Sequence, residues 1–219
     1  RAPATAEKTA FGVPPGPLSA GFLLEGRYQV VKVLGEGGFG LVYQALDRAR
    51  NGQFVAIKQI TISSLSPREA IEATESYHRE ITHLSQLHHE NLPRIYDHFT
   101  DQSHWYIVMD YIDGKTIEKT LAGTQALPVP EVIKIGTILC SVLGYLHGQH
   151  PPIIFRDLKP SNIMWSQTGQ LYLIDFGIAL SYSSVGQRDT RPLGTPGYAA
   201  PEQYGKAQST IQTDIYGLG

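Results

Sequence analysis

"RYQVVKVLGEGGFGLVYQAL" spans residues 27–46 and decides which fold the glycine cluster at 35–40 belongs to. This cluster matches G-x-G-x-x-G, a pattern that is weak by itself because glycine-rich hairpin turns also produce it. Residues 27–34 and 41–46 carry β-branched and aromatic side chains at the spacing of strands. We therefore predict two antiparallel strands joined by the glycine loop.

Two other nucleotide-binding loops contain similar glycines, and the residues that follow exclude both. A P-loop requires Lys and then Ser or Thr after its last glycine, whereas Leu41 and Val42 stand there. A dinucleotide-binding loop has to open a helix, but strand-like residues follow this one. Backbone amides approach phosphate oxygens closely where side chains are absent, so a hairpin lid over nucleotide phosphates remains.

The dipeptide Asn51-Gly52 turns the chain into a third strand, "FVAIKQI" at 54–60. Alternation puts Ala56 and Lys58 on one face of this strand. Ala56 is small enough to leave room for a flat ring, and Lys58 lies two residues further on to meet phosphates. A lone strand lysine is usually a solvated edge residue, so this interpretation depends on the glycine hairpin before it.

A helix is predicted to follow, with Ser66 as N-cap, Pro67 in the first turn and Glu69 completing a capping box. We expect this helix to run to about Leu87.

Within this helix Glu80 shares one face with apolar residues, among them Tyr77 and Leu84. Burial of an unpaired carboxylate is costly, so we predict that Glu80 pairs with Lys58. The alternative is that Glu80 lies at the solvated edge of the apolar stripe.

Strands come first and helices later in this chain, which predicts an α+β fold of two lobes. A further strand is expected at 105–112, a long apolar helix at 130–148, and two short strands around "SQTGQ" at 166–170. The start of the chain is rich in Ala, Pro and Gly and has no sustained period, as in a linker. We therefore divide the chain into a flexible linker, a first lobe and a second lobe, at residues 1–25, 26–112 and 113–219.

"IIFRDLKPSNIM" at 153–164 sets two cations, a carboxylate and an amide between apolar flanks. Asp157 would accept a hydroxyl proton there, and Lys159 would neutralise charge on a moving phosphoryl group. A turn-stabilising aspartate would not explain the neighbouring lysine and amide.

The strands around 166–170 should pair as a hairpin in which Ile163 opposes Ile174. The same register sets Asn162 opposite Asp175. An amide oxygen and a carboxylate would then meet at one end of the ribbon, and hard oxygen ligands of this kind suit Mg²⁺.

Composition argues against several other classes of protein. The net charge of −2 and a pI near 6.5 give no basic surface for nucleic acid. The lone Cys140 cannot form an internal disulfide, so the reducing cytosol is the default location, and its apolar helix suggests a core position. His83, His88 and His89 have no cysteine or acidic partners at metal-ligand spacing, which favours surface or packing roles.

With these motifs in order over roughly residues 27–219, the chain resembles the eukaryotic-like, Hanks-type Ser/Thr protein kinases, most closely their bacterial branch. The resemblance implies a bilobal fold with a small antiparallel β-sheet and one long helix in the first lobe. The second lobe would be mainly helical and incomplete, because the family's pattern continues beyond Gly219. "GTPGYAAPE" at 194–202 looks like the end of an activation segment, which argues against a small-molecule kinase.

The resemblance implies a non-specific Ser/Thr protein kinase that transfers the γ-phosphoryl group of MgATP to protein hydroxyls. The implied catalytic residues are Asp157, Lys159, Lys58 and Glu80, and the implied Mg²⁺ ligands are Asn162 and Asp175. The implied contacts to ATP are Gly35, Glu36, Gly37, Gly38, Phe39, Gly40, Val42, Ala56, Lys58, Met109, Asp110, Ile112 and Met164.

Other residues carry further implications of the same resemblance. Lys159 is the Ser/Thr-kinase hallmark, Thr195 would link the catalytic aspartate to the substrate-binding segment, and Phe155 replaces the usual histidine in a packing role. Arg156 suggests control by phosphorylation of the activation loop, because a guanidinium can order a phosphorylated loop. The candidate phosphosites are Thr190, Ser183 and Ser184.

The implied partners are ATP and proteins with Ser or Thr acceptors, with autophosphorylation or pairing in trans as further expectations. The kinase domain would be cytoplasmic, and a membrane would be reached only through a segment outside this chain. The alternative function is an ATP-binding pseudokinase or scaffold, above all for a truncated chain.

Overall fold

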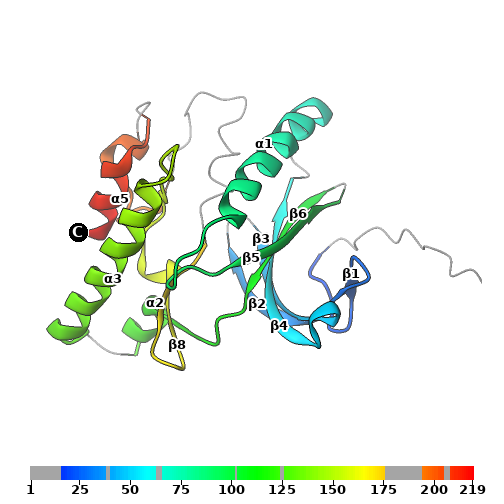
Figure 1. The fold of residues 1–219 in the computed structure, drawn as a ribbon, viewed down its shortest axis with the longest axis horizontal. Coiled ribbons are helices and arrows are strands. Elements are labelled where there is room, and N and C mark those ends of the chain that lie inside the picture. Colours follow the sequence, from blue (N-terminus) through cyan, green and yellow to red (C-terminus); the bar gives the residue numbers. More distant parts are fainter. Residues whose placement is uncertain are drawn as a thin grey trace, which may run out of the picture.

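The computed structural model describes residues 16–37, 40–62, 66–101, 103–123, 126–175, 194–204 and 208–219. The chain forms two lobes, as predicted, with α1 against the sheet of the first lobe and α3 and α5 in the second (Figure 1). The first sheet runs in the order β1 (Leu23–Leu24), β2 (Tyr28–Gly37), β3 (Gly40–Asp47), β4 (Gln53–Thr61), β6 (His104–Asp110) and β5 (Ile95–Thr100).

The predicted strand–glycine–strand–strand unit is confirmed, because β2, β3 and β4 pair antiparallel in sequence order. Gly40 begins β3 with φ of 142°, and a Cβ there would lie 1.9 Å from the carbonyl oxygen of Gln59. Such an approach leaves no room for a side chain, so glycine is required where β3 meets β4.

Helix α1 (Pro67–Ser85) starts as predicted, with both hydrogen bonds of the Ser66–Glu69 capping box in place. It packs on the sheet through Tyr77, whose ring stacks on Trp105 with centroids 4.7 Å apart. The buried Tyr77 hydroxyl donates to the backbone oxygen of Tyr106 at 2.8 Å, which satisfies its polar atom inside the core.

The predicted linker at 1–25 is too long, because its last part belongs to the first lobe. Leu18 and Leu24 are each only 3% exposed and lie in the same apolar cluster as Tyr43. The Leu18 N–H also donates to the Tyr43 hydroxyl at 3.1 Å. Large apolar side chains in this Gly- and Pro-rich stretch pack against the sheet of the first lobe, which the composition of the stretch did not indicate.

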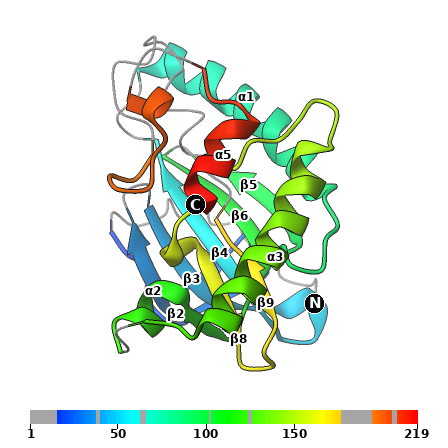
Figure 2. The same cartoon turned by 90° about the vertical axis from the view of Figure 1, so that its left-hand side faces the viewer.

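The second lobe contains α2 (Ile117–Leu121), α3 (Val129–His147), α5 (Ile211–Leu218) and a sheet of β7 (Gly114–Thr116), β8 (Ile163–Ser166) and β9 (Leu171–Leu173). Short 3₁₀ turns lie at Arg48–Arg50, Pro160–Asn162 and Pro201–Tyr204. Figure 2 shows α5 alongside α3.

In the described part of the chain, α3 alone is long and apolar enough to cross a membrane by length and composition. One face of α3 is nevertheless packed into the lobe, as in a core helix, through Ile135, Leu139, Val142, Leu143 and Leu146. Cys140 does not belong to this face and is exposed, so its predicted core position is wrong. An apolar helix does not bury every face, and its sequence alone did not show which one points inward.

The predicted hairpin register is off by one residue, because Ile163 pairs with Leu173 rather than Ile174. The turn closes one residue earlier than expected: the Ser166 N–H donates to the Gln170 oxygen at 2.8 Å. Gly169 takes the left-handed conformation, with φ of 80°, that lets a three-residue loop reverse the chain. A one-residue change in loop length shifts every pair in the hairpin.

Candidate active site

A cavity of about 350 Å³ lies between the lobes, and residues of β2, β3, β4 and β6 line it together with residues of the second lobe. Eight of the predicted nucleotide contacts line it: Gly35, Val42, Ala56, Lys58, Met109, Asp110, Ile112 and Met164. Glu36, Gly37 and Gly40 are described but are not lining residues, and Gly38 and Phe39 fall outside the described residues.

Several lining residues had escaped the sequence reasoning. Leu34 and Ile174 flank predicted motifs, and continuing the strand alternation would have found Leu34. The others come mainly from a segment for which no element had been predicted, where β7 and α2 lie. The remaining residues are Pro93, Gly114, Thr116, Glu118, Lys119 and Ser161, whereas Tyr111 lies within the segment predicted as a strand at 105–112.

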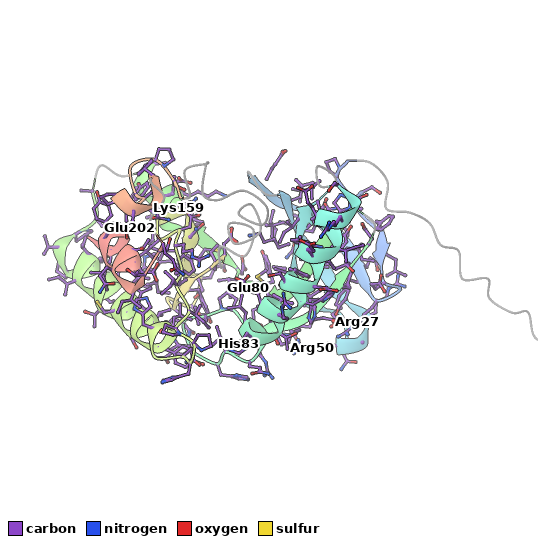
Figure 3. All side chains as sticks on the ribbon, turned by 90° about the horizontal axis from the view of Figure 1, so that it is seen from above. Arg27, Arg50, Glu80, His83, Lys159 and Glu202 are labelled. Atoms are coloured by element: carbon purple, nitrogen blue, oxygen red, sulfur yellow. The ribbon has the colours of Figure 1, made fainter. Side chains whose placement is uncertain are left out.

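The Lys58 ammonium forms its ion pair with the Asp175 carboxylate in this structure, not with Glu80 as predicted. Lys58 is 7% exposed, so its charge requires a partner. Asp175 adopts a left-handed backbone conformation, φ 68°, in which its side chain reaches Lys58. Glu80 is half-buried on α1, between the lobes (Figure 3). Strand and helix periods cannot decide which of two carboxylates a cation reaches, because that depends on how the lobes pack.

The Asp157 carboxylate lies at the centre of a hydrogen-bonded cluster. Its Oδ1 accepts from the Thr195 hydroxyl at 2.8 Å, and that hydroxyl accepts from Lys159 Nζ at 2.6 Å. Its Oδ2 lies 2.8 Å from Lys159 Nζ and 3.0 Å from the Asn162 amide nitrogen. The cluster brings one carboxylate, one cation, one hydroxyl and one amide together, with the Asp157 side chain only 13% exposed.

Asp157 is not among the residues that line the cavity, but it adjoins the cavity through this cluster. Asn162 is the next residue after the lining residue Ser161. In the shifted hairpin register, Asn162 lies opposite Ile174: the Ile174 N–H donates to the backbone oxygen of Asn162 at 2.8 Å. The prediction that Asn162 lies opposite Asp175 is therefore wrong.

Asp214 holds the backbone of the loop that carries Asp157, a role that the sequence reasoning missed. Its buried carboxylate accepts the N–H groups of Phe155 at 2.8 Å and Arg156 at 2.7 Å, and contacts His147 Nε2 at 2.8 Å. Arg156 has φ of 68°, so the loop bends sharply at this point. An aspartate at the start of an apolar helix was the one available signal, because a buried carboxylate needs several donors.

Lys159 and Glu202 both belong to the second lobe (Figure 3). The Glu202 carboxylate accepts the Thr213 hydroxyl at 2.6 Å, which lowers the pKa of Glu202 below its usual value. The candidate phosphosites Thr190, Ser183 and Ser184 lie outside the described residues.

The chemistry of Asn162 and Asp175 fits a divalent cation such as Mg²⁺. The Asn162 amide donates through its nitrogen to Asp157, which leaves its oxygen as the ligand atom. The Asp175 carboxylate lines the cavity. Two oxygen ligands are enough for Mg²⁺, since it normally takes its other ligands from water and phosphates. The described residues contain no group of three or more His, Cys, Asp or Glu that would hold a metal without such help.

Comparison with known proteins gives a consistent result. The family model described as "Protein kinase domain" matches residues 28–219. The chain is 34% identical over 204 residues to the probable serine/threonine-protein kinase PknB of Lactococcus lactis, covering 92% of this chain and 32% of that protein. It is also 34% identical over 197 residues to the serine/threonine-protein kinase PrkC of Bacillus subtilis, covering 90% of this chain and 30% of that protein.

The fold has solved counterparts. A crystal structure of the Mycobacterium tuberculosis PknI kinase domain, a C20A mutant, superposes with a TM-score of 0.71 at 28% identity. The match covers 93% of this chain and 74% of that chain. The chain thus spans about a third of the length of the two curated relatives and three quarters of this kinase domain.

Proposed function

This chain belongs to the protein kinase family, and we propose that the protein containing it transfers the γ-phosphoryl group of MgATP to serine or threonine hydroxyls of other proteins. The observation that carries the proposal is the Asp157–Thr195–Lys159 cluster beside a cavity that Lys58 and Asp175 line. The choice of Ser/Thr acceptors is supported by Lys159 and by the names of the relatives.

In this proposal Asp157 accepts the proton of the substrate hydroxyl as its oxygen bonds to the γ-phosphorus. The bond from that phosphorus to the β,γ-bridging oxygen breaks, and ADP leaves with the electron pair. Lys159 neutralises charge on the transferring group, while Lys58 meets the phosphates from the other side of the cavity. Thr195 orients Asp157 and Lys159 through one hydroxyl.

Asn162 and Asp175 would hold Mg²⁺. When bound, this ion neutralises phosphate charge and orients the phosphates for in-line transfer. The ion pair between Lys58 and Asp175 would have to open, because the phosphates and the metal need these two groups. Glu80 is then the carboxylate proposed to form an ion pair with Lys58 in place of Asp175.

The pseudokinase alternative is not favoured, because the curated relatives are kinases and the chain carries each predicted catalytic residue. The test is phosphoryl transfer from γ-labelled ATP by the full-length protein, with Mg²⁺ and a basic acceptor protein. Wild type should label itself or the acceptor, and Asp157→Asn should lower the rate by about 10²-fold or more. Equal rates for both proteins would contradict the proposal.

A further inference from the structure

Asp110 ends β6 at the edge of the cavity, and three hydrogen bonds tie it to β5 and the residue before it. Its carboxylate accepts the Arg94 N–H at 2.8 Å with one oxygen and the Tyr96 hydroxyl with the other. Its own N–H donates to the Arg94 oxygen at 3.0 Å. A cavity-lining residue is thus held through its side chain as well as its backbone.

Tyr96 reaches Asp110 because it lies in a β-bulge. Ile95 pairs with Met109 and Asp97 pairs with Val108, so Tyr96 is the extra residue on β5. A regular ladder would have set Tyr96 opposite Val108. A bulge bends the strand and re-aims a side chain, and here the hydroxyl points at the end of β6.

The Tyr96 ring is also contacted by Arg50, whose guanidinium carbon lies over the ring, 4.0 Å from its centroid. This cation–π contact joins the turn after β3 to β5. Burial and the Asp110 carboxylate raise the pKa of Tyr96, so the hydroxyl remains a donor at neutral pH.

We propose that Tyr96 is a positioning residue for the nucleotide: by holding Asp110 it sets the conformation of residues 110–112, which line the cavity. This inference rests on the proposed function, since the nucleotide is taken to be ATP. Tyr96 is not among the lining residues, so it acts through Asp110. Cavity residues that are already ordered before the nucleotide binds lower the entropy lost on binding, because fewer groups have to be immobilised.

The test is Tyr96→Phe, which removes the hydroxyl and keeps the ring beneath Arg50. Tyr28→Phe is the matched control, because the Tyr28 hydroxyl, like that of Tyr96, donates to a carboxylate. Its acceptor is Asp97 on β5, at 2.7 Å. A guanidinium, that of Arg27, also lies over its ring, 4.8 Å from the centroid. Neither Tyr28 nor Asp97 lines the cavity.

The Kd of MgATP for the chain of 219 residues is measured by titration calorimetry, with inorganic triphosphate and Mg²⁺ as a second probe that lacks adenine. Residues 110–112 directly follow Met109, which pairs with Ala56 at the proposed ring end of the cavity rather than with Lys58. Tyr96→Phe should therefore raise the Kd of MgATP about three- to tenfold and leave that of triphosphate unchanged. Tyr28→Phe should change neither Kd. In the full-length enzyme, Tyr96→Phe should raise KM for ATP more than it lowers kcat.

If Tyr96→Phe bound MgATP with the same Kd as wild type, the inference would be overturned but the proposed function would not. Equal weakening by both variants would overturn the inference too, because the loss would then belong to the sheet as a whole. A wild-type chain that binds no MgATP, in a parent protein that transfers no phosphoryl group, would overturn the proposed function and the inference with it.

Discussion

The Thr195 hydroxyl lies between Lys159 and Asp157, accepting from the ammonium at 2.6 Å and donating to the carboxylate at 2.8 Å. One small side chain therefore joins the segment at 194–202 to the loop that carries the proposed base. Because both partners are only partly exposed, the hydrogen bonds are shielded from water and hold the two groups firmly.

Thr195→Val should disturb the orientation of Asp157 and Lys159 without weakening nucleotide binding. It keeps the shape of the side chain and removes the hydroxyl, so Asp157 and Lys159 lose their shared partner. We expect kcat to fall about tenfold or more with little change in KM for ATP, as measured by steady-state kinetics on the full-length protein. Thr195→Ser should recover most of the rate, and an unaltered kcat in the valine variant would argue against this role.

Asp214→Asn should loosen the loop that carries Asp157. The amide presents one acceptor oxygen where the carboxylate presents two, so one of the N–H groups of Phe155 and Arg156 would lose its partner. Because the site is buried, we expect a loss of about 2–4 kcal/mol in the free energy of unfolding, measured with urea. Glu202→Gln is the comparison and should cost less, because Glu202 is only half-buried whereas Asp214 is 1% exposed.

Gly40→Ala and Gly35→Ala form a matched pair within the glycine loop. A Cβ at Gly40 would lie 1.9 Å from the Gln59 oxygen, whereas a Cβ at Gly35 meets nothing within 4 Å. We therefore expect Gly40→Ala to cost about 2 kcal/mol or more of unfolding free energy. Gly35→Ala should melt within a few degrees of wild type in a thermal scan. Similar melting of the two variants would show that β3 and β4 can separate freely.

Leu18→Ala tests whether the segment before β1 belongs to the first lobe. The Leu18 side chain is 3% exposed, so its truncation should cost about 2–3 kcal/mol in urea unfolding. Leu23→Ala is the control, because Leu23 is 37% exposed and should change stability little. Identical stabilities would mean that the segment is dispensable, as the linker prediction had assumed.

His98 should make stability depend on pH. Burial and then the neighbouring His78 lower the pKa of His98, while Asp97 opposes this shift. The unfolded state, with a pKa near 6.5, therefore takes up the proton more readily than the folded state. The contribution of His98 is fully present above that value and is lost as the pH falls through the folded pKa. Unfolding free energies measured across this range should vary less with pH in His98→Gln than in wild type.

Local features of the chain were predictable because each depends on residues a few positions apart. The antiparallel strands around the glycine loop, the capping box of α1 and the span of α3 follow from alternation, capping chemistry and helical period. The hairpin around β8 and β9 was also predicted, but its register depended on one residue of turn length.

The sequence by itself determined which chemical groups the chain carries and which strands and helices present them. The link from Thr195 to Asp157, expected from the family resemblance, is confirmed. Only the tertiary structure decided two other partners: Asp175 rather than Glu80 for Lys58, and Asp214 for the loop that carries Asp157. Lys58 and Asp175 are 117 residues apart in the chain, so no local period relates them. Their contact arises because burial of two apolar faces brings the lobes together, and a buried charge then pairs with whichever carboxylate the packing places within reach.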